Sequence, residues 1–188
     1  MRVITAPEEY IKEDKDITCF LAGGITNCWE WQDEVIKTLN NINLPNLVLF
    51  NPRQKNFDIK NPNAADDQIR WEFEYLQKMD IFSMYFCGNT VSDQPICFYE
   101  LGRYLQITIN KYSNISDHFL VTMESDFKRI KDVIVQTNLA AKHTSNYHNR
   151  VFVEEIELED DRKLSAQRHA RKIASMYTQL SVMNRLGL

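Results

Sequence analysis

Short apolar runs alternate along the chain with segments whose apolar residues recur at helical spacing. The apolar runs end in glycine, proline or a polar turn, which is typical of buried β-strands. The expected strands cover residues 16–24, 46–52, 80–88, 117–123 and 150–158. The expected helices cover residues 28–42, 65–79, 95–110, 125–139 and 160–186. Because strand alternates with helix, the pattern predicts one domain over residues 1–188. The predicted fold class is α/β: a three-layer α/β/α sandwich with a mainly parallel five-stranded sheet and an added C-terminal helix.

The expected sheet also predicts where a ligand binds. Open parallel sheets bind ligands beyond the carboxyl ends of their strands. This rule selects the loops at residues 23–31, 51–53 and 88–94, together with the start of the helix expected at residues 95–110. Residues of these segments that can do chemistry are therefore the candidates for a site.

Charge and cysteine content exclude several classes of protein. The net charge is −4 and the isoelectric point about 5.6, so no overall positive field attracts nucleic acid, and we expect no nucleic-acid partner. The four cysteines form no CxxC pair and no histidine lies at ligand spacing, which argues against a zinc site and favours buried free thiols. No apolar run approaches the ~20 residues of a membrane span, and no signal-peptide core is recognisable. We expect a cytoplasmic protein without a membrane partner.

Gly23 and Gly24 follow the first expected strand in the stretch FLAGGI. They either form a plain tight turn or bring the backbone close to a ligand, but they do not form a GxGxxG fingerprint. Trp31 could stack on a flat base or pack in the core. Gln32 carries a donor and an acceptor and could read a base edge.

Glu72 lies beside the apolar residues of its expected helix, which are Ile69, Phe73 and Leu76. If it is half-buried there, desolvation raises its pKa, which suits a proton donor near neutral pH. The alternative is an ion pair with one of three cations, Arg70, Lys78 or Arg53. Arg53, two residues after Asn51, could equally bind a phosphate or carboxylate of a ligand.

Glu100 lies near the start of its expected helix, in the stretch FYELGRYL. The positive end of the helix dipole favours an ionised carboxylate there, and an ionised, oriented carboxylate can act as a nucleophile. Gly102 costs helix stability, so we expect another backbone or a ligand to approach it closely. Asp93, in the preceding loop, could bind a sugar hydroxyl or simply form a turn.

Four stretches together carry a resemblance to a known family. They are FLAGGITNCWEWQ, LFNPRQKNF, QIRWEFEYLQKMDIF and QPICFYELGRYL, in this order. Over roughly residues 17–110 they resemble the nucleoside 2-deoxyribosyltransferase-like family, whose members fold as flavodoxin-like sandwiches and often form oligomers. The family breaks the N-glycosidic bond of 2'-deoxynucleosides and passes the sugar to another base, or to water in hydrolytic relatives.

The resemblance implies roles for the candidates. Glu100 matches the nucleophile that forms a glycosyl-enzyme intermediate, and Glu72 matches the acid that protonates the departing base. Asp93 stands for a sugar-binding aspartate, although its offset from Glu100 is one residue longer than in the family. The substrate-binding residues expected are Gly23, Gly24, Trp31, Gln32, Asn51, Arg53 and Asp93. No metal or redox cofactor is needed, and the implied partners are a small nucleoside or nucleotide and further copies of the chain in a homo-oligomer.

Two questions stay open at this stage. After about residue 113 the resemblance thins, and the C-terminal helix could pack on its own domain, form a subunit interface or, through its basic first half, bind nucleic acid. The function also has alternatives: hydrolysis of another N-glycoside, such as an NAD-derived nucleotide, or nucleotide binding without catalysis. Fold analogy alone does not choose among them.

Overall fold

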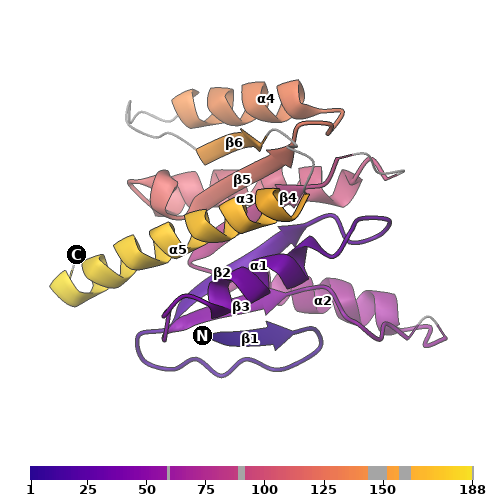
Figure 1. Ribbon diagram of the computed structural model, residues 1–188, viewed down its shortest axis with the longest axis horizontal. Coiled ribbons are helices and arrows are strands. Elements are labelled where there is room, and N and C mark those ends of the chain that lie inside the picture. Colours follow the sequence, from indigo (N-terminus) through magenta and orange to yellow (C-terminus); the bar gives the residue numbers. More distant parts are fainter. Residues whose placement is uncertain (59, 89–91, 144–151, 157–161, 188) are drawn as a thin grey trace.

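The protein is built on one parallel sheet. The computed structural model describes residues 1–58, 60–88, 92–143, 152–156 and 162–187 (Figure 1). Within these residues, six strands form the order β1-β3-β2-β4-β5-β6, and every neighbouring pair is parallel. The strands are β1 (Arg2–Thr5), β2 (Ile17–Gly23), β3 (Leu47–Asn51), β4 (Ile81–Phe86), β5 (Phe119–Glu124) and β6 (Phe152–Ile156).

The expected α/β sandwich is confirmed, and β1 adds an edge strand to the five that the pattern predicts. Its four residues are too few for periodicity to reveal, and it is held by pairing with β3, beginning at Arg2 opposite Val48. Without β1 the strand order is that of flavodoxin-like folds, in which the first strand lies between the second and third. The order therefore reverses between β2 and β4, which is where such sheets bind ligands.

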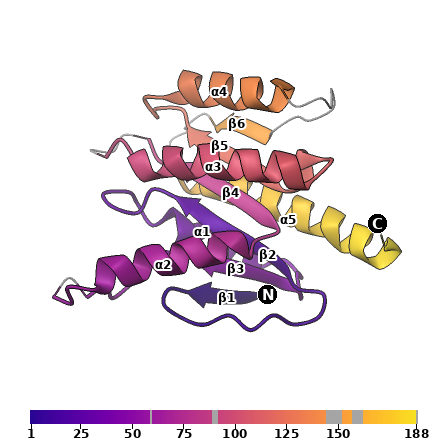
Figure 2. The ribbon, with the colours of Figure 1, turned by 180° about the vertical axis from the view of Figure 1, so that it is seen from behind.

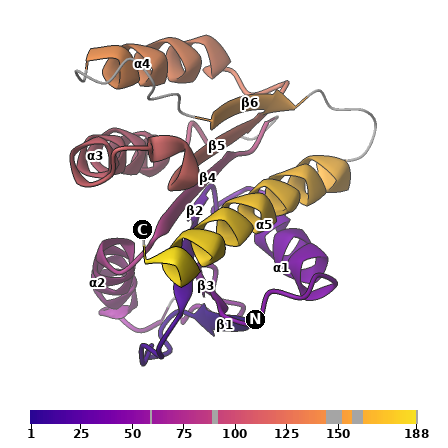
Figure 3. The same ribbon diagram turned by 90° about the vertical axis from the view of Figure 1, so that its left-hand side faces the viewer.

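Helices cover both faces of the sheet (Figures 2 and 3). One face carries α2 (Ala64–Gln77), α3 (Pro95–Lys111) and α4 (Ile130–His143), and the other carries α1 (Trp31–Asn40) and α5 (Arg162–Leu186). The central strands β2–β5 are almost fully buried and rich in Phe, Leu, Ile and Val, as expected for a sheet covered on both sides, whereas the edge strand β1 is half-buried. The apolar core therefore consists of two layers separated by the sheet.

Of the three residues predicted for the apolar face of α2, only Leu76 is buried. Trp71 and Tyr75 are buried and stack on each other at 4.1 Å between ring centroids, whereas Ile69 and Phe73 are 62% and 49% exposed. The larger rings can be buried because their polar atoms also have partners. Trp71 Nε1 and Tyr75 Oη both donate to the carbonyl of Glu8, each at 2.9 Å.

Two helices begin later than predicted. Helix α4 begins at Ile130 and not near Ser125, because the chain first makes a turn in which the Phe127 amide donates to the Glu124 carbonyl at 2.9 Å. The Phe127 ring is buried against Phe86, which holds this turn on the core. Helix α1 begins at Trp31 and not at residue 28, since the carbonyl oxygens of Cys28 and Trp29 accept hydrogen bonds from Arg53.

Helix α5 packs on its own domain. Its buried residues include Ile173, Met176 and Leu180 of the predicted stripe, whereas Leu164 is turned outward. Near its start, His169 is fully buried and bonds Ser83 Oγ at 2.6 Å and Thr122 Oγ1 at 2.8 Å, so the helix is tied to β4 and β5 by polar contacts as well. Burial lowers the pKa of His169 to about 3, so the imidazole is neutral at physiological pH.

Candidate active site

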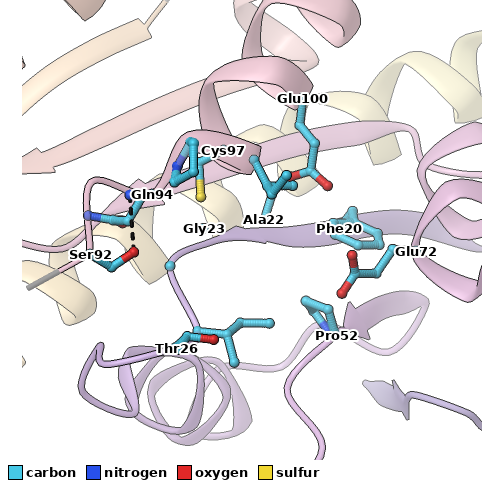
Figure 4. Close-up of a pocket in the computed structure, with 14 residues that line it drawn as sticks. Phe20, Ala22, Gly23, Thr26, Pro52, Glu72, Ser92, Gln94, Cys97 and Glu100 are labelled. Atoms are coloured by element: carbon cyan, nitrogen blue, oxygen red, sulfur yellow. Dashed lines mark hydrogen bonds between the residues drawn. The ribbon is translucent and has the colours of Figure 1, made fainter. Parts of the chain in front are cut away.

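A hollow of about 220 Å³ lies at the carboxyl end of β2, next to β4, where the strand order reverses. Four of the predicted site residues line it: Gly23, Gly24, Glu72 and Glu100. Figure 4 shows the two glutamates reaching toward the same space from separate helices, with Phe20 between the ends of their side chains. The hollow therefore lies at the edge of the sheet where the rule for open parallel sheets predicts a ligand.

The glycine turn is required by the shape of the hollow. Gly23 has a φ of +148°, and a Cβ there would meet the Tyr85 carbonyl oxygen at 2.3 Å. A Cβ on Gly24 would meet Cys28 Sγ at 2.3 Å and Gln94 Oε1 at 2.4 Å. Only glycine fits at Gly23, where the clash is with backbone, whereas a Cβ on Gly24 would displace the side chains of Cys28 and Gln94. The backbone of the turn can therefore form part of the wall itself.

Glu72 is held by a side chain one helical turn earlier. Gln68 Nε2 donates to Glu72 Oε1 at 2.6 Å and to the Pro52 carbonyl at 2.8 Å, and Gln68 Oε1 accepts a hydrogen bond from Gln54. Desolvation by burial raises the pKa of Glu72, and the bond from Gln68 lowers it in part. The raised pKa agrees with the expected proton donor, and no ion pair of Glu72 is found among the described residues.

Glu100 lies in the same hollow and lacks a hydrogen-bond donor among the residues that the structure describes. Desolvation by burial, followed by the negative charge of Glu72, raises the pKa of Glu100 from 4.5 to about 8. A pKa of about 8 means that Glu100 is mostly protonated near pH 7, and not ionised as expected. Being five residues into α3, Glu100 lies beyond the first turn, where the dipole acts most strongly, so burial outweighs it.

The two carboxyl groups therefore share a site that disfavours two negative charges. The negative charge of Glu72 adds to burial in raising the pKa of Glu100, so a proton on one of the two acids is favoured near neutral pH. Such a pair can supply one acid and one carboxylate within a single cavity.

Arg53 does not face the hollow. Its guanidinium closes the loop after β2: Nη2 lies within 3.3 Å of four backbone carbonyls, those of Gly24, Ile25, Cys28 and Trp29. Nε donates to Gln32 Oε1 at 2.8 Å. The expected ion pair of Arg53 with Glu72 is not found among the described residues, because carbonyl oxygens of the loop bind the guanidinium.

Trp31, Gln32 and Asn51 support the site from behind. Trp31 is fully buried, stacks on Tyr85 at 4.8 Å and donates to the Gly24 carbonyl at 2.9 Å. Gln32 is also fully buried, and Asn51 Oδ1 accepts from the Arg53 amide at 3.1 Å. The structure does not bring these side chains to the hollow, since the core and the loop clamp hold them.

Asp93 is exposed and does not line the hollow, whereas its neighbours Ser92 and Gln94 do. Gln94 has a φ of +49° and its side-chain amide bonds the Cys87 backbone twice, with Nε2 donating to the carbonyl at 2.8 Å and Oε1 accepting from the amide at 3.2 Å. These bonds fix the start of α3, which begins at Pro95, and hence the position of Glu100.

Gln68 and Gln94 were missed as site residues in the sequence. The spacing of four residues between Gln68 and Glu72 is a signal for neighbouring side chains on one helix face. The position of Gln94 directly before a helix-starting proline also marks a boundary residue, but its bonds to Cys87 depend on the tertiary fold. Gly102, by contrast, meets nothing within 4 Å of an added Cβ, so the expected close approach by another backbone is wrong.

Metal binding and membrane insertion would each require particular groups of residues. No group of three or more His, Cys, Asp or Glu side chains able to hold a metal ion occurs in the described part of the chain. Over the same residues, no helix has the length and apolar character needed to cross a membrane.

Comparison with known families matches residues 16–114 to the family described as nucleoside 2-deoxyribosyltransferase like. The match covers just over half of the 188 residues and includes the glycine turn and both glutamates. A comparison with curated proteins found no match. Since the matched segment also contains β2–β4 and α1–α3, the chain belongs to the nucleoside 2-deoxyribosyltransferase-like family.

Proposed function

We propose that this protein cleaves the N-glycosidic bond of a (deoxy)nucleoside or nucleotide and transfers the sugar to another base or to water. The observation that carries the proposal is the pair of desolvated glutamates, from α2 and α3, that line one small hollow beside a glycine turn. Family membership supports the substrate class, and the site chemistry supports the reaction type.

In the proposed reaction, Glu100 is the nucleophile and Glu72 is the acid. The proton retained by the carboxyl pair resides on Glu72 when the substrate is bound, which leaves Glu100 ionised. Glu72 donates this proton to the base as the bond from its nitrogen to the anomeric carbon breaks. Glu100 forms an ester with that carbon through an oxocarbenium-like transition state, and a second base or water then breaks the ester. Each of the two displacements inverts the anomeric carbon, so the product retains the configuration of the substrate.

The environment of Glu100 suits this role. A carboxylate without hydrogen-bond donors in a desolvated site is poorly stabilised before the reaction, whereas a developing positive charge on the sugar stabilises it at the transition state. The difference between the two states is what lowers the barrier. The hydrogen bond from Gln68 orients the carboxyl group of Glu72, so that this group can face the base.

The test is release of free base from a panel of nucleosides, nucleotides and NAD, measured by mass spectrometry. We expect Glu100→Ala to bind substrate but to lose turnover by roughly 10³-fold or more, as expected for removal of a nucleophile. The matched control is Glu74→Gln, because Glu74 lies on α2, is 60% exposed and pairs with Lys78 away from the hollow. Base release by Glu100→Ala at the wild-type rate would remove Glu100 from the mechanism.

The same panel distinguishes the alternatives. Release of nicotinamide in preference to a purine or pyrimidine would identify an NAD-derived N-glycoside as the substrate. Saturable binding of intact ligand, with no base released by the wild type, would identify a nucleotide-binding protein without catalytic activity. A glycosyl-enzyme adduct on Glu100, detected as a mass increase on the peptide containing residues 95–103, would support covalent catalysis directly.

A further inference from the structure

A second, larger chamber opens from the hollow that holds the two glutamates. It has a volume of about 580 Å³, against about 220 Å³ for the inner hollow. The two cavities share Glu72 and Glu100, and also Ile25, Thr26, Pro52 and Ile96. They are therefore inner and outer parts of one site, with the carboxyl groups between them.

The two parts differ in the chemistry of their walls. The inner hollow has a mixed lining, made of the glycine turn, of apolar side chains such as Phe20, Ala22 and Cys97, and of polar side chains, among them Ser92 and Gln94. The outer chamber is walled by apolar and aromatic side chains from the loop after β3, from α2 and from α3, namely Phe57, Ile69, Phe73, Leu76, Ile96, Tyr99 and Tyr104. Polar contacts suit a sugar, and this second wall suits an apolar group.

The outer wall leaves a large apolar area in water. Ile69, Ile96 and Tyr99 are 62%, 64% and 66% exposed, and Phe73 is 49% exposed. Single exposed apolar residues are ordinary, but a group gathered from three elements around one opening marks a binding surface. Arg103, at the same wall, lies with its guanidinium 4.7 Å from the Phe73 ring centroid, which adds a flat stacking surface.

We propose that the outer chamber binds the departing base, and that the preferred substrates carry an apolar substituent on that base. This inference rests on the proposed function. The acid that protonates a base must lie beside it, and Glu72 shares its helix with Ile69 and Phe73 of the outer wall. A sugar held at Glu100 therefore directs its base along α2 into the chamber. A bare base would leave much of the chamber unfilled, whereas an alkyl or aryl substituent would cover the exposed wall.

The experiment compares matched substrates. We would measure kcat/KM for 2'-deoxyadenosine with and without a benzyl group on its exocyclic nitrogen, and for 2'-deoxyuridine with and without a phenyl group at C5. Even one added methylene in an apolar pocket raises kcat/KM by about 10-fold or more. We therefore expect at least one substituted substrate to exceed its parent by about 10-fold or more, and a carboxymethyl group at the same position to abolish the gain.

Variants test whether the wall causes the preference. Phe73→Ser and Ile96→Ser should reduce the ratio of substituted to parent kcat/KM toward one, and the ratio within each variant cancels a general loss of activity. The matched control is Leu139→Ser, since Leu139 is 58% exposed on α4 and does not line either chamber. An equal rate for parent and substituted substrates in the wild type would overturn the inference and leave the proposed function intact.

Binding of the free base separates the two proposals if no nucleoside is cleaved. Saturable binding of N6-benzyladenine, measured by calorimetry and weakened in Phe73→Ser but not in Leu139→Ser, would support the chamber as an apolar base site. No measurable binding, or equal binding by both variants, would overturn it. Self-association of the wild type that Phe73→Ser and Ile96→Ser abolish would assign the wall to a second copy of the chain and would also overturn the inference.

Discussion

Two acids near the same edge of the sheet, the fully buried Glu124 and the half-buried Glu100, have opposite surroundings. Glu124 ends β5, is fully buried and accepts three hydrogen bonds, from Trp29 Nε1 at 2.7 Å, Tyr85 Oη at 2.9 Å and the Gly88 amide at 2.7 Å. Arg162 Nε lies 3.9 Å from Glu124 Oε2. Glu124 thereby joins the loop after β2, strand β4 and the loop after β4.

Glu100 has no such partners. Within the described residues Glu100 receives no hydrogen bond. The charge that acts on its pKa belongs to another acid, Glu72. Burial of a charged group is costly unless it is paired and hydrogen-bonded. Glu124 satisfies this condition, and Glu100 avoids the cost by retaining a proton. The comparison indicates that an acid with donors serves the fold, whereas an acid without donors beside a cavity is available for chemistry.

The largest effect on stability is expected when each of the two acids is replaced by leucine. Glu124→Leu should lower the free energy of unfolding by about 3–5 kcal/mol, because it leaves buried donors unsatisfied. Glu100→Leu should leave the free energy of unfolding unchanged or raise it, since no donor loses a partner. Denaturant melts of both variants measure the difference, and equal destabilisation would remove the distinction between the two acids.

A smaller effect should follow from removing the donor to Glu72. Gln68→Met keeps the length of the side chain but loses the hydrogen bond that lowers the pKa of Glu72. A hydrogen bond to a charged group contributes about 1.5–3 kcal/mol, so its loss should raise the pKa of Glu72 further above the ordinary value. The alkaline limb of the kcat/KM profile should move up by the same amount. Gln77→Met, on the same helix but bonded to Tyr104, is the control and should leave the profile in place.

The protonation of Glu100 predicts how stability depends on pH. The native protein retains this proton up to about pH 8, whereas an unfolded chain loses it near the ordinary pKa of 4.5. The native state binds more protons in that window, so the free energy of unfolding should fall as pH rises through it, by at most about 1.4 kcal/mol per pH unit. Glu100→Gln should flatten the slope and Glu74→Gln should not; a slope that Glu100→Gln leaves unchanged would contradict the raised pKa.

The smallest effect compares two glycines. Gly102→Ala should raise the free energy of unfolding by about 0.5–1 kcal/mol, because an added Cβ meets no atom within 4 Å and alanine favours the helix. Gly23→Ala should instead destabilise the protein, since its φ is +148° and its Cβ would overlap the Tyr85 carbonyl oxygen. Thermal melts separate the two, and a destabilising Gly102→Ala would restore the close approach that the sequence predicts.

Local pattern was sufficient for much of the fold. The alternation of strands and helices, and the edge of the sheet where the hollow and its two glutamates lie, could be predicted from the chain because periodicity and chain order determine them. Partner choice could not be read in this way. Arg53 was expected at a ligand or at Glu72, and its role as a clamp depends on four carbonyls of a loop that lies 24 to 29 residues earlier.

The sequence by itself determined the sandwich, the glycine turn and the two acids on successive helices, since these follow from spacing along one dimension. Only the tertiary structure decided that Trp31 and Gln32 stay in the core, that Gln68 and Gln94 support the site, and that Glu100 retains a proton. The physical reason is that burial and hydrogen bonding depend on which elements meet. The desolvation that sets the pKa of a carboxyl group is a property of its surroundings and not of its neighbours in the chain.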